Sequence, residues 1–145
     1  MTFARWCQWL FYASLLFAAL GFVVAVAPNL GWVGTWSAQV DAHFFPERIH
    51  PNAIAERSFL MAILGATIAG MYILQAFVVA FPFRNREAWA WYAIAGSNLA
   101  WFVLDSGLSV LHGLTFNIYT VNLFPLFILG IPLLATRSAF SSPRA

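Results

Sequence analysis

The stretch FLMAILGATIAGMYILQAFVVAF, residues 59–81, decides the fold of this chain. It contains no charged residue, and Pro82 follows it directly. A helix of about 20 residues crosses the hydrocarbon core of a bilayer, which is roughly 30 Å thick, so this stretch is long enough to span a membrane. Because a lone segment in lipid must satisfy its own backbone hydrogen bonds, the stretch predicts a transmembrane α-helix.

Three further apolar stretches of similar length lie at about residues 6–27, 88–106 and 114–136. The 145-residue chain is 62% hydrophobic and only 8% charged, and a soluble domain of this size cannot bury so much apolar surface. The sequence therefore predicts an all-α protein, with residues 1–145 forming a single membrane domain built as a four-transmembrane-helix bundle.

The first stretch also has features of a secretory signal peptide, with Arg5 before it and an Ala-Val-Ala tripeptide at its end. Its apolar run is longer than the usual core of a signal peptide, and Pro28 would directly follow the cut. We therefore expect the stretch to be retained as the first helix.

The connection between the first two helices, residues 28–58, is the one long connection in the chain. It is too polar to cross a membrane, but it contains Trp32, Trp36, Phe44 and Phe45. Part of it fits a helix with one apolar side, which is typical of segments that lie in the membrane interface. We expect a structured cap at the outer end of the four helices.

The distribution of arginine predicts the orientation, because positively charged residues gather on the cytoplasmic side of membrane proteins. With both termini inside, the inner segments hold Arg5, Arg84, Arg86, Arg137 and Arg144, and the outer segments hold Arg48 and Arg57. This bias predicts a multi-pass membrane protein with both termini in the cytoplasm. Seven scattered arginines do not form the clustered basic patch that nucleic-acid binding needs, so no nucleic-acid partner is expected.

Asp105 is the most informative polar residue, because ionisable groups near membrane depth usually have a function or a partner. Asn98 and Trp101 lie on the same side of that helix, at steps of three and four residues. Asn117, Tyr119 and Thr120 belong to the outer half of the last helix. Together these residues predict a ligand-binding polar pocket that opens outward. The alternative is an Asp105 at the membrane interface that caps a helix or pairs with Arg57.

Other ionisable residues gather on the same predicted outer side. His43, Glu47 and His50 are of the types that bind metals, but Pro46 interrupts their spacing and no compact metal-binding pattern such as H-E-x-x-H is present. We therefore expect no metal site and no cofactor. Glu56 lies near the beginning of the second helix. It either interacts favourably with the positive end of the helix dipole or assists Asp105 in acid–base chemistry.

The last apolar stretch contains Pro125 and Pro132, each of which removes a backbone donor and favours a bend. The bend is either a kink packed against its neighbours or a place where the freed carbonyl groups of Val121 or Ile128 line a cavity.

Several motifs between residues 65 and 140 resemble small, uncharacterised bacterial four-helix integral membrane proteins. The residues that carry the similarity are 86–92 (REAWAWY), 101–107 (WFVLDSG), Phe116-Asn117, Asn122-Leu123 and 131–137 (IPLLATR). The resemblance implies the four-span topology and a bacterial inner membrane, and it implies no activity.

Three functions are compatible with this sequence. The favoured one is non-enzymatic binding of a lipophilic small molecule or a protein partner at the outer half of the helices, within the lipid bilayer. The second is a membrane-embedded enzyme in which Asp105 performs acid–base chemistry with Glu56 or a histidine. The third is an accessory subunit that packs through its small-residue faces into a homo-oligomer or a larger membrane complex.

Overall fold

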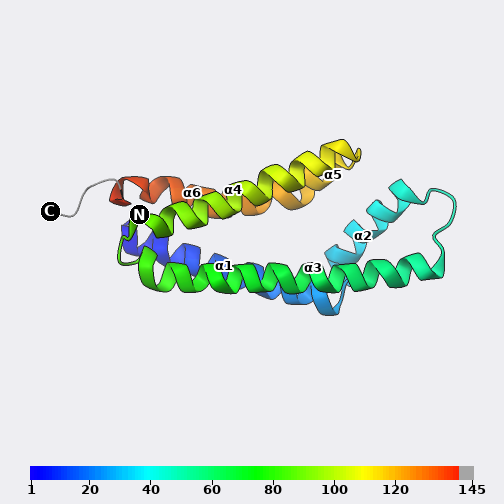
Figure 1. The fold of residues 1–145 in the computed structure, drawn as a ribbon, viewed down its shortest axis with the longest axis horizontal. Helices are drawn as coiled ribbons and strands as arrows, with labels where there is room; N and C mark the ends of the chain where they lie inside the picture. The colour runs from blue at the N-terminus through cyan, green and yellow to red at the C-terminus, as the bar shows by residue number, and fades with distance from the viewer. Residues whose placement is uncertain (141–145) are drawn as a thin grey trace. The chain divides into compact units, whose positions relative to one another are not determined.

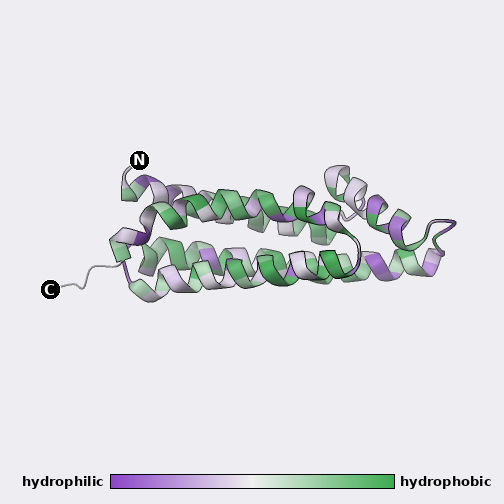
Figure 2. Cartoon of the chain, turned by 90° about the horizontal axis from the view of Figure 1, so that it is seen from above, coloured by the Kyte–Doolittle hydropathy of each residue, from purple (hydrophilic) through white to green (hydrophobic). Residues whose placement is uncertain are grey.

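The computed structural model describes residues 1–140, and this part of the chain is helical without any strand (Figure 1). Four helical stretches are long and apolar enough to cross a membrane: Phe3–Val26, Pro51–Phe83, Ala88–Leu111 and Thr115–Phe140. The predicted class, all-α with four candidate membrane spans, is therefore confirmed. Hydrophobic residues run along all four stretches (Figure 2), which identifies the chain as a membrane protein.

The elements follow one another along the chain with short connections. They are α1 (Phe3–Val26), α2 (Gly31–Phe44), α3 (Pro51–Val78), the π-helical turn η1 (Val79–Phe83), α4 (Ala88–Leu111), α5 (Thr115–Asn117), the π-helical turn η2 (Ile118–Asn122), α6 (Leu123–Thr136) and the 3₁₀ turn η3 (Arg137–Phe140). The carboxy-terminal Arg144, which contributes to the predicted orientation, lies outside the described residues.

Two of the helices extend beyond their apolar stretches. α3 begins at Pro51 rather than at residue 59, and Pro51 suits the first helical position because its missing N–H has no partner there anyway. α4 continues past Asp105 to Leu111, where Gly113, with a φ of 72°, allows the chain to turn. The connection predicted at residues 28–58 is correspondingly shorter, and α2 occupies most of it.

Backbone contacts divide the chain into two compact units, and the division falls inside α1 and α3. One unit is Leu15–Ile73, which contains α2 and the parts of α1 and α3 nearest to it. The other contains Met1–Ser14 and the described residues from Leu74 onward.

In the unit Leu15–Ile73, α1 and α3 approach so closely that their backbones touch. A Cβ atom added at Gly65 would lie 2.5 Å from the Gly21 carbonyl oxygen, and one added at Gly21 would lie 2.6 Å from the Ala69 amide nitrogen. Small residues allow this contact, which is how helices associate in lipid without a hydrophobic driving force. Phe17 and Tyr72 pack beside the crossing with their ring centroids 5.0 Å apart.

In the other unit, aromatic rings join the beginning of α1 to the end of the described chain. The fully buried Phe83 stacks on Phe3 at 6.1 Å and meets Phe140 at 4.7 Å between ring centroids. Leu10 of α1 and Leu129 of α6 are also buried in this unit. These contacts hold the beginning of α1, η1 and η3 together.

Pro132 in α6 removes the amide that would normally bond to the Ile128 carbonyl, four residues earlier. The indole Nε1 of Trp9 donates to that carbonyl oxygen at 2.9 Å. Trp91 of α4 similarly donates to the carbonyl oxygen of Leu133 at 2.9 Å. At Ile128 the freed carbonyl thus bonds to a neighbouring helix, as expected for a packed kink.

Candidate functional site

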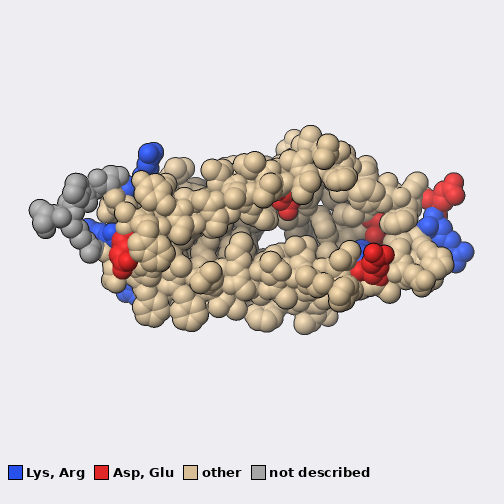
Figure 3. Space-filling view, viewed as in Figure 1, with Lys and Arg blue, Asp and Glu red and all other residues tan. Residues whose placement is uncertain are grey.

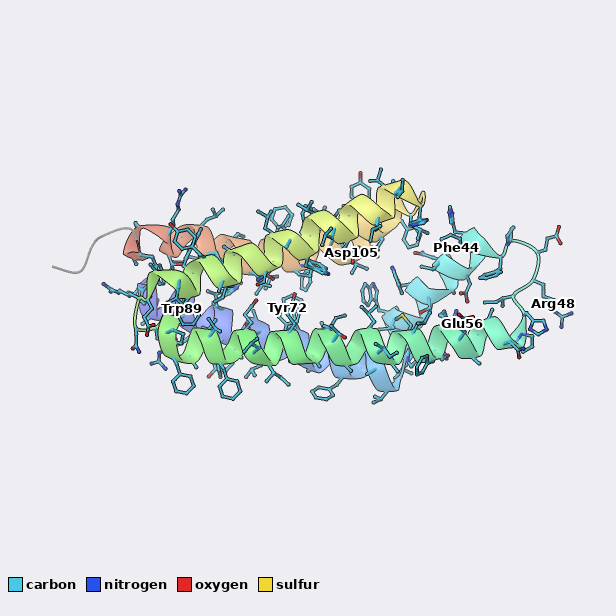
Figure 4. The ribbon with its side chains drawn as sticks, in the orientation of Figure 1. Phe44, Arg48, Glu56, Tyr72, Trp89 and Asp105 are labelled. Carbon is cyan, nitrogen blue, oxygen red and sulfur yellow. The ribbon has the colours of Figure 1, made fainter. Side chains whose placement is uncertain are left out.

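Asp105 lies in the second half of α4 (Figure 4). It is the centre of a cluster of polar side chains. Its Oδ1 atom accepts hydrogen bonds from the Nδ2 atoms of Asn117 at 2.8 Å and Asn122 at 3.0 Å. The Ser109 hydroxyl also lies 3.3 Å from the same oxygen. The predicted approach of Asn117 toward Asp105 is therefore present in the structure.

The two asparagine amides are each fixed by a second bond. Asn117 Nδ2 also donates to Ser109 Oγ at 2.8 Å, and Asn122 Nδ2 also donates to Ser106 Oγ at 3.0 Å. Each amide thus uses both of its hydrogens on α4. Turning either amide around would place its oxygen against the Asp105 carboxylate, which offers no hydrogen when ionised, so the carboxylate determines the orientation of both.

The π-helical turn η2 explains why both asparagines reach the same carboxylate. In a regular α-helix, residues five apart point about 140° away from each other, because each residue advances the helix by roughly 100°. In η2 the hydrogen bonds run from residue i to i+5, as in the bond from the Leu123 amide to the Ile118 carbonyl, so Asn117 and Asn122 come close to one face. Such turns are rare and frequently occur at functional sites.

Ser109, Asn117 and Asn122 of the cluster are buried, whereas Asp105 and Ser106 are partly exposed, and the hydrogen bonding of the cluster is incomplete. Asn122 is 0% exposed, and its Oδ1 atom has no hydrogen-bond partner. Asp105 Oδ2 has no hydrogen-bond partner and Asp105 has no ion-pair partner among residues 1–140. The hydrogen-bond donors observed at the Asp105 carboxylate are therefore the neutral side chains of Ser109, Asn117 and Asn122.

Arg57, the alternative partner considered for Asp105, is engaged elsewhere. In the unit Leu15–Ile73 its guanidinium forms a salt bridge with Asp41 of α2, and it donates to Asn29 Oδ1 at 3.0 Å. These bonds connect α3 to α2 and to the turn that precedes it.

A second polar chain involves Asn98, which its helical spacing predicts in the Asp105 pocket. Asn98 Nδ2 donates to Gln75 Oε1 at 2.8 Å, and Gln75 Nε2 donates to Ser14 Oγ at 3.0 Å. Ser14 and Gln75 are buried, and the Ser14 hydroxyl donates to the carbonyl oxygen of Leu10 at 2.7 Å. The chain connects α1, α3 and α4, so its geometry suits helix association.

The remaining predicted residues lie outside both clusters. Tyr119 is 71% exposed, and Trp101 is partly exposed without a hydrogen bond to the described residues. Glu56 is exposed on α3, and Thr120 bonds to its own helix at the Phe116 carbonyl.

The weak metal candidates lie at the carboxyl end of α2 and in the loop after it. His43 packs its ring against Phe44 at 5.0 Å, His50 Nδ1 accepts from the Asn52 amide at 3.2 Å, and Glu47 is exposed. Within the described part of the chain, no three His, Cys, Asp or Glu residues gather in a group that could hold a metal ion.

Asn122 and Gln75 belong to these polar networks, and the sequence pattern alone does not predict either role. Gln75 carries a visible signal, since it is an amide inside a stretch of apolar residues, and polar groups at that depth usually find a partner. Asn122 has a weaker signal, because α-helical periodicity places it away from Asn117 and only the π-helical turn brings the two together.

Comparisons of the chain with protein-family models, with curated proteins and with solved structures find no match.

Proposed function

We propose that this membrane protein binds a lipophilic molecule at the polar cluster around Asp105. The observation that carries the proposal is a carboxylate within a candidate membrane span that receives bonds from Asn117, Asn122 and Ser109 but has no positive partner among the described residues. An isolated charge at membrane depth is costly, so such residues commonly mark binding sites.

The surroundings of Asp105 favour a ligand that enters from the lipid. Its neighbours Leu104 and Leu108 on α4 are more than half exposed, as is Tyr119 on η2. Most of the face visible in Figure 3 carries no charged side chain. A molecule with an apolar body can therefore contact these side chains while a polar group reaches the cluster.

The membrane and the orientation are part of the same proposal. The arginine distribution and the resemblance to bacterial four-helix proteins support an inner membrane with both termini in the cytoplasm. Acid–base catalysis by Asp105 and assembly into a larger complex stay predictions, and no particular contact favours either.

Co-purification tests the proposal. The chain is purified in a neutral detergent and its non-covalent ligands are identified by native mass spectrometry and by solvent extraction. We expect a bound apolar molecule in the unaltered protein, and its loss in Asp105→Asn.

Glu87→Gln is the matched control, because Glu87 is a partly exposed acid directly before α4, and its side chain accepts a hydrogen bond from the Trp89 indole at 2.8 Å. A glutamine can accept the same bond while removing the same charge. Folded protein that is repeatedly free of any ligand would count against the proposal, as would equal ligand content in Asp105→Asn.

A further inference from the structure

The atoms that remain unused in the Asp105 cluster are mostly acceptors. Both Nδ2 hydrogens of Asn117 and of Asn122 are already donated within the cluster. The Ser109 hydroxyl donates its hydrogen to Asp105. Asp105 Oδ2 and the buried Asn122 Oδ1 stay without a partner, and only the Ser106 hydroxyl retains a hydrogen to give.

The helices that form the cluster contribute no other formal charge near the carboxylate. From Ala88 to Thr136, Asp105 is the only residue with a formal charge when His112 is counted as neutral. The cluster therefore combines one negative charge with acceptor atoms that need hydrogens. A ligand that balances the negative charge and also bonds to the free acceptor atoms must have a positive charge and several N–H donors.

We infer that the group bound at this cluster is the protonated amine of an amphiphilic molecule, an alkylammonium, with its ammonium on Asp105 Oδ2 and Asn122 Oδ1. The inference rests on the proposed function and names the class of its ligand. A fatty acid or a phosphate group is excluded by repulsion from Asp105 and by the shortage of free donors.

Inorganic cations share part of this chemistry. Mg²⁺ and Ca²⁺ take six or more oxygen ligands and usually more than one carboxylate, whereas this cluster has a single carboxylate. A monovalent alkali ion carries the same charge as an ammonium. It brings no apolar body to cover the exposed leucines of α4, so the ammonium amphiphile fits the surroundings better.

Three amphiphiles with the same chain length and different head groups test the inference. Dodecylamine, dodecanol and dodecanoic acid are titrated at pH 7 into the unaltered protein in dodecyl maltoside, and thermal unfolding is followed by tryptophan fluorescence. We expect a saturable rise in Tm with dodecylamine alone, because a ligand that binds the folded state stabilises it. This comparison uses no variant, so it holds even if a substitution at Asp105 prevents folding.

Asp105→Asn and Glu87→Gln then locate the effect. Removing one partner of a buried charge pair weakens binding by about thirtyfold or more, so we expect Asp105→Asn to lose the dodecylamine response and Glu87→Gln to keep it. In a separate arm, sodium chloride replaces potassium chloride at constant ionic strength. A saturable rise with sodium, lost in Asp105→Asn and without any dodecylamine response, would overturn the inference in favour of an alkali ion.

The two proposals fail in different ways. Equal stabilisation by all three amphiphiles, unchanged in Asp105→Asn, would overturn the ammonium inference and leave lipophilic binding in place. No response to any of the three, together with purified protein free of bound lipid, would overturn both.

Discussion

At the scale of single residues, Asn122 holds the Asp105 cluster together. It donates to Asp105 Oδ1 at 3.0 Å and to Ser106 Oγ at 3.0 Å, and its side chain is fully buried. Asn122→Ala removes both bonds and leaves a small cavity. We expect the free energy of unfolding to fall by about 1–3 kcal/mol, measured by denaturation in mixed detergent micelles.

Tyr119 provides the control for this substitution on the same turn, since it is 71% exposed. Tyr119→Phe should change the free energy of unfolding by less than about 0.5 kcal/mol. If the two variants unfold with the same free energy, the bonds of Asn122 add no stability and the cluster is not rigid.

The same residues show how far the sequence predicts the site. Asp105 and Asn117 are recognisable because each is a polar residue at a defined place in an apolar pattern. Asn98 shares a side of α4 with Asp105, yet it bonds to Gln75, because helical spacing specifies a side but not the neighbouring helix that meets it. Asn122 depends on a local change in helix geometry that residue spacing does not encode.

At the scale of elements, the contact between Trp9 of α1 and the Ile128 carbonyl of α6 compensates for Pro132. Trp9→Phe leaves that carbonyl without its donor, and we expect a loss of about 1 kcal/mol in the free energy of unfolding. In a Pro132→Ala background the backbone amide returns, so Trp9→Phe should cost much less there. A double-mutant cycle measures this difference. An equal cost in both backgrounds would mean that Trp9 acts only through packing.

The crossing of α1 and α3 depends on Gly65. A methyl group at this position would lie within about 3 Å of the backbone of Gly21 and Ala25, whereas one at Gly70 meets nothing within 4 Å. We expect Gly65→Ala to lower the free energy of unfolding by about 1–3 kcal/mol and Gly70→Ala to be neutral or slightly stabilising. Both variants are compared by unfolding in mixed micelles, and equal stability would contradict the close crossing.

The helix boundaries show what an apolar pattern can and cannot predict. All four spans lie where the apolar stretches predict them, because helix is the stable way to carry a backbone through lipid. α3 and α4 nevertheless continue for several residues into polar sequence, to Pro51 and Leu111. Hydrophobicity predicts where a helix enters the membrane, and the end of the helix depends on turn residues such as Gly113.

At the scale of the whole molecule, the arginine distribution predicts both termini in the cytoplasm, and cysteine labelling tests this. Cys7 is the only cysteine of the chain and is buried in α1. The Cys7→Ser protein therefore has no cysteine that a maleimide could modify. Single cysteines are then introduced as Glu47→Cys, in the exposed loop between α2 and α3, and as Asn85→Cys, in the turn between η1 and α4.

In intact bacterial cells, a membrane-impermeant maleimide should modify the Glu47→Cys protein. It should modify the Asn85→Cys protein only after the cells are permeabilised, because the positively charged segment around Arg84 and Arg86 stays on the inner side. The reverse labelling pattern would mean that the chain has the opposite orientation in the membrane. Asp105 would then belong to the cytoplasmic half, and its ligand would have to arrive from the inner leaflet. The Asn122 and headgroup experiments would keep their meaning, since they depend on the cluster and not on the side it faces.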